Sequence, residues 1–218
     1  SAPRLGRRGL RRLLHPSMRR VLTIGIVLAV FQQWCGINVI FNYAQEIFSA
    51  AGYGVSDILM NIVVTGITNV VFTVIAMLLV DRLGRRPLLL IGAGGLTLIY
   101  VLMGGAYHFG LSGVALLVVV VAAIACYAMT LAPIMWVVIS EIFPNAVRGV
   151  AMSIATVALW SASFVLTYTF PLLNSSLGAA GTFWLYGFIC LCGFFFVLRR
   201  VPETKNKTLE AIEKELVR

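Results

Sequence analysis

The long apolar stretches of this 218-residue chain contain no Asp, Glu, Lys, Arg or His. Charged residues make up only 11% of the sequence, and they lie between those stretches or at the two ends. A proton relay or an ion site inside a membrane normally needs an ionisable group at membrane depth. A membrane-embedded enzyme would need a nucleophile with its base, or a pair of carboxylates. The sequence therefore argues against both classes, and we expect a protein that is not an enzyme.

Metal-binding patterns and strand patterns are also missing. The two histidines, His15 and His108, have no second His, Cys or carboxylate at ligand spacing, so we expect no metal and no cofactor. The four cysteines all fall inside apolar stretches, where a thiol acts as a small packing residue. The alternation typical of transmembrane strands is absent, which argues against a barrel.

Hydrophobic residues dominate instead. They make up 60% of the chain, and the mean hydropathy of +0.96 is typical of an integral membrane protein. Apolar stretches of about 20 residues, the length that a helix needs to cross a bilayer, recur along the sequence. The six candidate spans are approximately Val21–Tyr43, Ile58–Val80, Leu88–Tyr107, Val114–Ile139, Val150–Leu173 and Phe183–Leu198. We predict an all-α, polytopic membrane protein in which residues 21–198 form a six-transmembrane-helix bundle.

Lysine and arginine gather in four places along the chain. Of the 17 such residues, seven lie in residues 1–20, three in Asp81–Arg86, one at Arg148 and six in residues 199–218. A six-span chain puts all four places on one side, and the loops of the other side contain none. The positive-inside rule then predicts a multi-pass protein of the cell membrane with both termini cytoplasmic. The net charge of +9 reflects topology and attraction to the anionic lipid bilayer, and we expect no nucleic acid partner.

The first span carries several amides around one glycine. Gln32, Gln33 and Asn38 flank Gly36 in an otherwise apolar segment, and Asn42 stands just beyond. Unsatisfied amides in hydrocarbon are costly, so these groups must meet neighbouring helices, water or a ligand. On a straight helix Gln33 and Asn38 would point about 140° apart, and they can serve one site if the helix loosens at Gly36. Broken helices of this kind line transporter cavities. Hydrogen bonding between helices is the alternative.

Polar residues follow one face of three further spans. They recur at helical spacing: Asn61, Thr65, Thr68, Asn69 and Phe72 in the second span, Tyr127, Thr130, Pro133, Trp136 and Ser140 in the fourth, and Ser153, Thr156, Trp160, Ser163 and Thr167 in the fifth. We expect spans one, two, four and five to face a cavity, supported by spans three and six. Hydroxyls that bond to their own helix are the alternative for the Ser and Thr positions. Pro133, in mid-span, frees a carbonyl and bends its helix, which suits a hinge.

The polar groups of these spans suit a neutral polyol. Amides donate and accept hydrogen bonds, and an indole packs on the apolar face of a pyranose. Motifs in six places then match one family in the order in which the family has them. They are Gln32-Gln33-x-x-Gly36-Ile37-Asn38, Gly66-Ile67-Thr68-Asn69, Asp81-Arg82-Leu83-Gly84-Arg85-Arg86-Pro87, Pro133-x-x-Trp136, Glu141-Ile142-Phe143-Pro144 with Arg148-Gly149, and Pro202-Glu203-Thr204-Lys205. Over nearly its whole length the sequence resembles the C-terminal half of a sugar porter of the major facilitator superfamily, of the bacterial sugar–proton symporter or facilitative hexose transporter type.

The resemblance implies a binding site and a partner. The positions that correspond to sugar-binding residues are Gln32, Gln33, Asn38, Asn69 and Trp136, and Tyr43 would lie near the extracellular gate. The family commonly has an amide immediately before the Trp of the fifth span, but Leu159 stands there, which leaves the sugar undefined. The family has twelve spans, and this chain begins at the basic linker between the two halves, residues 1–20. We expect the N-terminal six-helix half, or a second copy of the chain, to complete the cavity.

Two acidic residues at the ends of spans need cationic partners. Asp81 lies at a helix C-terminus, the unfavourable end for a negative charge, and Glu141 ends the fourth span. The resemblance implies that ion pairs close the cytoplasmic side when the cavity faces outward, with Pro133 as a hinge. The arginines available for these pairs are Arg82, Arg85, Arg86 and Arg148. Charge that only sets topology is the alternative, and it explains the arginines but not the acids.

The sequence thus predicts half of an alternating-access carrier for a monosaccharide, such as a hexose or a pentose. Amphipathic surface helices are expected in residues 1–14 and in the cytoplasmic tail, residues 199–218, where Thr208 would cap a short helix. The alternative from another class is a non-transporting membrane sugar sensor, or a truncated subunit retained for assembly.

Overall fold

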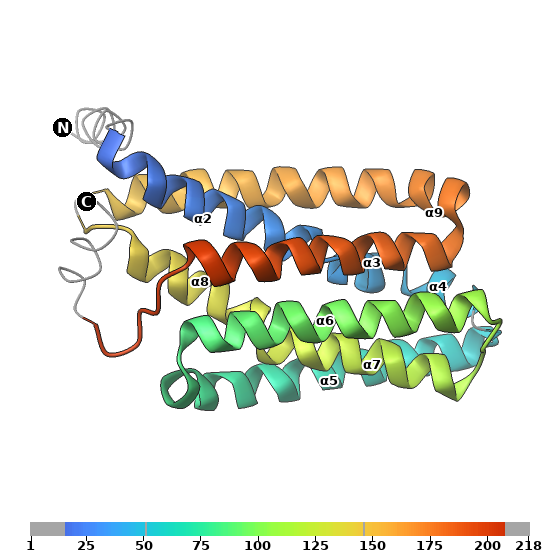
Figure 1. The fold of residues 1–218 in the computed structure, drawn as a ribbon. Coiled ribbons are helices and arrows are strands. Elements are labelled where there is room, and N and C mark those ends of the chain that lie inside the picture. Colours follow the sequence, from blue (N-terminus) through green and yellow to red (C-terminus); the bar gives the residue numbers. More distant parts are fainter. Residues whose placement is uncertain (1–15, 51, 146, 208–218) are drawn as a thin grey trace.

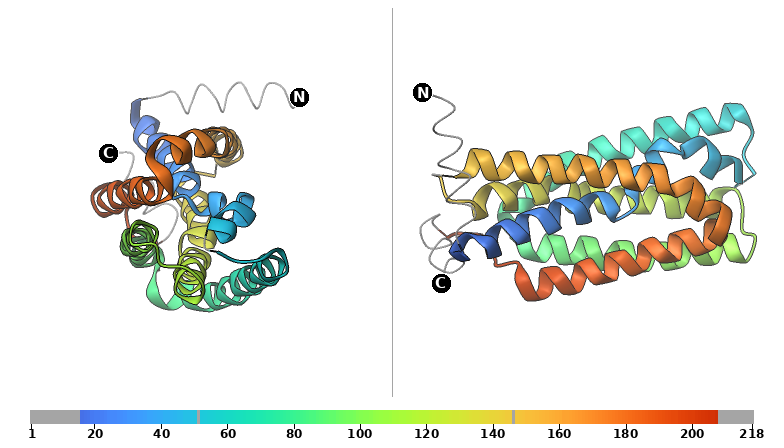
Figure 2. Two further views of the ribbon diagram at one scale, coloured as in Figure 1. Left: turned by 90° about the vertical axis from the view of Figure 1, so that its right-hand side faces the viewer. Right: turned by 90° about the horizontal axis from the view of Figure 1, so that it is seen from above.

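A computed structural model describes residues 16–50, 52–145 and 147–207, and the regular structure within these ranges is helical. In chain order the helices are α2 (Pro16–Trp34), α3 (Ile37–Asn42), α4 (Ala44–Ala50), α5 (Val55–Leu83), α6 (Arg85–His108), α7 (Val114–Met129), α8 (Leu131–Ile142) and α9 (Arg148–Arg200). They lie side by side along a common axis (Figure 1, Figure 2). The surface helices predicted for residues 1–14 and from Thr208 onward lie outside the described residues.

Five helical segments are long and apolar enough to cross a membrane. They are Met18–Asn42, Val55–Leu83, Arg85–His108, Val114–Ile142 and Arg148–Arg200. The last has 53 residues, and a straight helix of that length would extend about 80 Å across a hydrocarbon layer of about 30 Å. Gly178, with φ 69° and ψ 172°, interrupts it. Figure 1 shows α9 turning at one end of the bundle and running back to the other end. The two passes of α9 and the four other segments together make the six spans predicted from the sequence.

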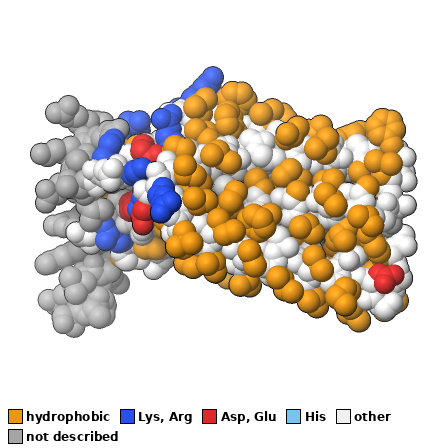
Figure 3. Space-filling model, turned by 90° about the horizontal axis from the view of Figure 1, so that it is seen from below, with side chains coloured by type: hydrophobic (Ala, Val, Ile, Leu, Met, Phe, Trp, Pro, Cys, Tyr) orange, Lys and Arg blue, Asp and Glu red, His pale blue; other side chains and the backbone are white. Residues whose placement is uncertain are grey.

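Charged side chains gather at one end of the bundle. Figure 3 shows Lys, Arg and acidic side chains where α2 begins and α9 ends, and a largely hydrophobic surface along the helices. This charged end includes the turn Asp81–Arg86, Glu141, Arg148 and the segment Arg199–Lys205. An apolar belt next to a charged end is the surface that a bilayer and its aqueous boundary require.

Two of the spans are broken. In the first, α2 ends at Trp34, and Gly36 adopts a left-handed conformation with φ 85° before α3 begins. A Cβ atom at Gly36 would lie 2.7 Å from Cγ of Tyr186, so the site has no room for a side chain. In the span Val114–Ile142, Thr130 separates α7 from α8 with φ −126° and ψ −82°.

The second break lies within one turn before Pro133, where a proline is expected to bend its helix. The helix is interrupted at Thr130, and Pro133 lies in the first turn of α8. A proline is tolerated there because the N–H groups of a first turn have no partner within the helix. If α7 and α8 formed one continuous helix, the proline ring would clash with the carbonyl of Met129, four residues earlier and the last residue of α7. The interruption at Thr130 is therefore the bend expected from Pro133, and its role as a hinge stays a prediction.

Replacing Gly36 tests whether the left-handed break holds the bundle together. Gly36→Ala should destabilise the fold by about 2 kcal/mol or more, because a left-handed L-residue costs about 1–2 kcal/mol and the methyl group would overlap the Tyr186 ring. The matched control is Gly105→Ala on α6, where a Cβ meets open space and the change should be neutral or slightly stabilising. Thermal unfolding of the purified protein in detergent compares them, and equal melting temperatures would contradict the strain at Gly36.

Candidate functional site

A cavity of about 510 Å³ lies among the first span, α7, α8 and the first pass of α9. This volume is within the range of about 300–1,000 Å³ typical of small-molecule sites. The residues that line the cavity are Gln32, Gln33, Asn38, Asn42, Tyr127, Ala132, Trp136, Leu159, Trp160 and Ser163. Gln32 and Gln33 fall in the middle third of the span Met18–Asn42, so the cavity reaches the interior of the apolar belt.

Three amides of the first span form a hydrogen-bonded chain across its break. The Nε2 group of Gln32 donates to the carbonyl of Ala132 at 3.1 Å, and that of Gln33 donates to Oε1 of Gln32 at 3.4 Å. The Nδ2 group of Asn38 in turn donates to Oε1 of Gln33. This contact requires the break, because the two side chains would diverge on a straight helix. The loosening predicted at Gly36 is confirmed.

The amide chain keeps hydrogen-bonding capacity for a ligand. A primary amide has two N–H donors and one carbonyl, and each of the three uses one N–H within the chain. Gln32 and Gln33 are only 4% and 7% exposed, so their remaining donors have little water to bond. Buried donors are stabilised by acceptors. The cavity floor therefore presents donors to the oxygen atoms of a bound molecule.

Aromatic side chains border the same cavity. Tyr127 comes from α7, Trp136 from α8 and Trp160 from α9. Trp136 and Trp160 are exposed, so their rings are available for contact. Trp34 has a different role, because its Nε1 group donates to the carbonyl of Ala162 at 3.1 Å and joins α2 to α9. Neutral amides together with aromatic rings suit a ligand that has hydroxyl groups and apolar C–H faces.

Four of the five predicted substrate residues meet here, and Asn69 does not. Gln32, Gln33, Asn38 and Trp136 line the cavity, whereas α5 contributes no lining residue. Asn69 is half-buried on α5, which packs mainly against α7. In the polar stripe of the second span, Asn61 and Thr65 are buried, and Thr68 and Asn69 are half-buried. None of these residues lines this cavity, and a role of Asn69 in sugar binding stays a prediction.

The sequence offered partial signals for the remaining lining residues. Tyr127, Trp160 and Ser163 belong to the polar stripes, and Asn42 follows the amide motif. Helical spacing identifies a face of a helix but does not tell which of its residues reach a cavity. Ala132 is apolar and gave no signal of its own.

At the end opposite the charges, side chains of α3 and the residue after it bond to α9. The hydroxyl of Tyr43 donates to the carbonyl of Thr167 at 3.0 Å, and its ring packs on Phe170 with the centroids 4.6 Å apart. The Nδ2 group of Asn42 donates to Oγ1 of Thr167 at 3.3 Å. Tyr43, the residue expected near a gate, therefore joins the first span to α9.

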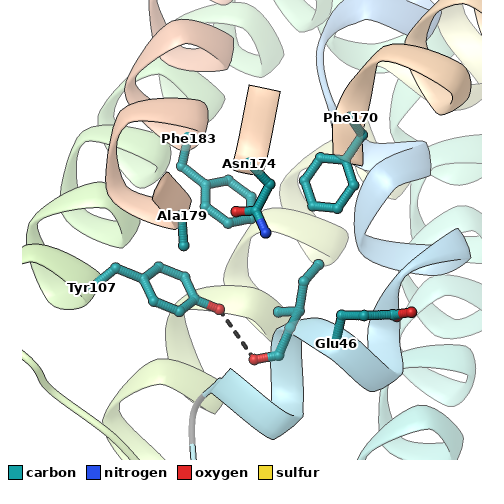
Figure 4. A pocket seen from close by; sticks show the side chains of 7 residues that line it. Glu46, Tyr107, Phe170, Asn174, Ala179 and Phe183 are labelled. Atoms are coloured by element: carbon teal, nitrogen blue, oxygen red, sulfur yellow. Dashed lines mark hydrogen bonds between the residues drawn. The ribbon is translucent and has the colours of Figure 1, made fainter. Parts of the chain in front are cut away.

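A much smaller cavity lies at that same end (Figure 4). Its volume of about 30 Å³ accommodates one or two water molecules. Asn174 lies between the rings of Phe170 and Phe183, and the hydroxyl of Tyr107 donates to the carbonyl of Ile47 at 3.1 Å. This region is tightly packed and leaves no room for a sugar.

At the charged end, Arg85 contacts both of the acids for which a cationic partner was predicted. Its Nη2 atom lies 3.2 Å from Oδ1 of Asp81 and 3.2 Å from Oε1 of Glu141. The other carboxylate oxygen of Glu141 accepts a hydrogen bond from Oγ1 of Thr204 at 2.6 Å. The side chain of Asp81 is 79% exposed and that of Glu141 only 23%. The pair with Glu141 is therefore the less screened of the two.

Glu203 caps the N-terminus of α6. Its carboxylate accepts hydrogen bonds from the backbone N–H groups of Arg85 and Arg86, both at 3.1 Å, and from that of Lys205 at 2.8 Å. Negative charge is favourable at a helix N-terminus. Gly84, with φ 90°, allows this approach, because a Cβ there would lie 2.9 Å from Oε2 of Glu203. The segment after α9 is thereby fixed to the turn between α5 and α6.

Three further basic residues at this end bond to backbone carbonyls. The side chain of Arg86 donates to the carbonyl of Leu198 at 2.6 Å, that of Arg148 to the carbonyl of Phe143 at 3.2 Å, and that of Lys205 to the carbonyl of Arg82 at 2.6 Å. Of the predicted gate arginines, Arg85 forms the ion pairs within the described residues, while Arg86 and Arg148 anchor helix ends.

Comparison with known proteins shows the family to which the chain belongs. A model of the family described as sugar (and other) transporters matches residues 7–216. The chain belongs to this family. It is 41% identical over 206 residues to an arabinose-proton symporter of Bacillus subtilis (strain 168), which covers 94% of this chain and 44% of that protein. It is 40% identical over 199 residues to a D-xylose-proton symporter of Escherichia coli (strain K12), covering 88% of this chain and 40% of that protein.

A solved structure shows the same fold. The major facilitator superfamily proton:xylose symporter XylE, bound to 6-bromo-6-deoxy-D-glucose, matches with a TM-score of 0.83 at 35% identity, over 96% of this chain and 46% of that chain. This member of the sugar transporter family thus spans less than half the length of each of these relatives. Its helices form part of a major facilitator bundle.

The cap on α6 can be tested by local hydrogen exchange. Glu203→Gln should speed amide exchange in the first turn of α6 by about tenfold or more, because hydrogen bonds to a charged group are worth about 1.5–3 kcal/mol. Asp81→Asn is the control, since an exposed ion pair contributes at most about 1 kcal/mol. Hydrogen–deuterium exchange of the peptide containing Arg85 and Arg86 measures both. Unchanged protection in Glu203→Gln would rule out the capping role.

Proposed function

We propose that the whole protein carries a monosaccharide across the cell membrane by alternating access, and that this chain supplies one six-helix half with most of the sugar site. The observation that supports this is the chain of amides at the broken first span, which borders a 510 Å³ cavity. Relatives named as arabinose and xylose symporters, and a similar structure with a bound glucose derivative, are consistent with a sugar.

The lining chemistry favours a neutral sugar over an ion. The lining side chains are amides, hydroxyls, aromatic rings and aliphatic groups. Amides match hydroxyl groups, which both donate and accept, and the rings of Trp136 and Trp160 match the C–H faces of a pyranose. An ion would need charged or closely spaced carbonyl ligands to replace its hydration. Gln32, Gln33, Asn38 and Trp136 are the residues to which we assign direct sugar contact.

Exposed residues on the first pass of α9 support a protein partner within the membrane. Trp160, Phe164 and Tyr168 recur every four residues and are each about two-thirds exposed. The indole N–H of Trp160 and the hydroxyl of Tyr168 have no hydrogen-bond partner among the described residues. Lipid tails cannot supply one. We assign this face to contact with the N-terminal six-helix half, or with a second copy of the chain.

We place the charged end in the cytoplasm, as the positive-inside rule expects. A proton-coupled cycle requires a protonatable group at membrane depth. The six spans of this sequence contain no Asp, Glu, Lys, Arg or His in their interiors. We therefore assign any such group to the other half of the carrier.

The ion pair at the charged end fits a cytoplasmic gate. Arg85 begins α6 and Glu141 lies in the last turn of α8, so their contact holds these two helices together. The break at Thr130 separates α8 from α7, and it gives α8 a place to pivot. We propose that the ion pair favours the state in which the cytoplasmic side is closed. We further propose that the contact of Tyr43 with α9 favours closure of the opposite side.

The first test removes an amide from the site. Gln33→Ala in the full-length protein should weaken sugar binding by about tenfold or more, because it removes one contact and leaves its neighbours unpaired. Thr23→Ala is the control, since Thr23 lies on the same helix and bonds only to the carbonyl of Arg19. Binding and uptake of radiolabelled arabinose, xylose and glucose in proteoliposomes measure the effect. A full-length protein that takes up no sugar would overturn the proposed function.

The second test opens the proposed gate. Glu141→Gln should increase the population whose cavity faces the cytoplasm without abolishing sugar binding, since a small bias shifts a nearly balanced equilibrium. The readout is the reactivity of Ala132→Cys, whose side chain lines the cavity, toward a membrane-impermeant thiol reagent added from either side. Glu46→Gln, at the opposite end, is the control. If reactivity from the two sides does not change, the charges serve topology alone.

A further inference from the structure

Ser163 differs from most other hydroxyl residues on the first pass of α9. Ser153, Thr156 and Thr169 donate to carbonyls of their own helix, at 2.9, 2.8 and 2.7 Å respectively. For these residues the alternative reading of the polar stripe is correct, and their hydroxyls are already satisfied. Ser163 lines the 510 Å³ cavity and has no hydrogen-bond partner among the described residues. Its hydroxyl is free to bond to a molecule in the cavity.

Tyr127 provides a second free hydroxyl from a different helix. It lines the cavity from α7 and is 8% exposed. The hydroxyls of Tyr100 and Tyr186 are fully enclosed without a partner, whereas that of Tyr127 is not enclosed in this way. It too has no hydrogen-bond partner among the described residues. The phenol therefore ends at the cavity surface, where only water or a ligand can satisfy it.

Leu159 makes the placement of these hydroxyls significant. It lies one helical turn before Ser163, lines the same cavity and is 3% exposed. The i and i+4 positions of a helix lie on the same face, about 6 Å apart along the axis. An aliphatic side chain offers no hydrogen bond, so a sugar hydroxyl placed against it would lose water without gaining a partner. Recognition on this wall must come from the next turn.

We propose that Ser163 and Tyr127 are two further sugar contacts, which supply from α9 and α7 the hydrogen bonds that Leu159 cannot make. This inference rests on the proposed function and adds to the amide contacts of the first span. The bound pyranose would direct one hydroxyl toward Ser163 and another toward Tyr127, with a C–H edge against Leu159. Specificity then depends on where a sugar has a hydroxyl and where it has only hydrogen.

The test removes each hydroxyl alone in the full-length protein. Ser163→Ala and Tyr127→Phe should each weaken binding of the best-bound of arabinose, xylose and glucose by about three- to tenfold. The matched controls are Ser161→Ala, on an exposed residue of α9, and Tyr53→Phe, whose hydroxyl has no hydrogen-bond partner among the described residues; neither residue lines the cavity. The controls should bind as the unmodified protein does. All four substitutions are small, and size-exclusion chromatography confirms that each variant folds.

A panel of monodeoxy sugars identifies the partner of each hydroxyl. The analogue that lacks the partner of Ser163 should bind about three- to tenfold more weakly than the parent sugar to the unmodified protein, and equally to Ser163→Ala. A different analogue should show this pattern with Tyr127→Phe. Binding by Ser163→Ala and Tyr127→Phe that equals the controls overturns the inference. So does a uniform loss across the panel.

Gln33→Ala separates this inference from the function on which it rests. If it abolishes binding while Ser163→Ala and Tyr127→Phe retain full affinity, the carrier is supported and only the two additional contacts fail. If the unmodified protein binds no sugar, the proposed function fails first.

Discussion

A bilayer interior offers no hydrogen bonds, so the amides at mid-depth must be satisfied within the protein. Gln32, Gln33 and Asn38 meet this requirement by bonding to one another and to the first turn of α8. Their pairing depends on the left-handed backbone at Gly36, and the Tyr186 ring beside Gly36 leaves no room for a side chain there. The φ angle of Gly36 thus decides whether the three amides pair and form a binding surface, or remain unpaired in the hydrocarbon layer.

The two ends of the bundle are held by different forces. At the charged end, directional bonds connect helix termini: Arg85 with Glu141, and Glu203 with the first turn of α6. At the other end, Tyr43 packs on Phe170 and bonds to one carbonyl. Ion pairs near water are individually weak, and salt weakens them further. Aromatic packing does not depend on salt in this way. Each end is therefore held by a small number of contacts, and opening either end would break only those contacts.

Hydropathy was sufficient to predict six spans, because bilayer thickness limits the length of every crossing helix. The break at Gly36 was also predictable, because amides on divergent faces needed a way to converge. What periodicity could not show is the neighbour that a helix face meets. The stripe containing Asn69 therefore suggests a cavity lining, but its residues do not line the 510 Å³ cavity, and helical spacing alone does not tell which neighbour the stripe meets. The bend expected from Pro133 is present as the break at Thr130, because a proline ring in a continuous helix would clash with a carbonyl one turn earlier. Arg85 and Arg86 are adjacent, and only coordinates could distinguish the ion-pairing arginine from the one that anchors a helix end.

The turn of α9 at Gly178 joins two passes through a single non-helical residue. A connection that short has no slack, so neither pass can slide along the membrane normal without its neighbour. The second pass fits closely against α6, where Trp184 donates to the carbonyl of Val101 and Gly187 lies against Tyr100. The first pass holds Leu159 and Ser163 at the cavity. The two passes are therefore tied to each other at the end of the bundle opposite the charged end. A movement of α6 would therefore pass through the second pass and Gly178 to the wall of the cavity that carries Leu159 and Ser163.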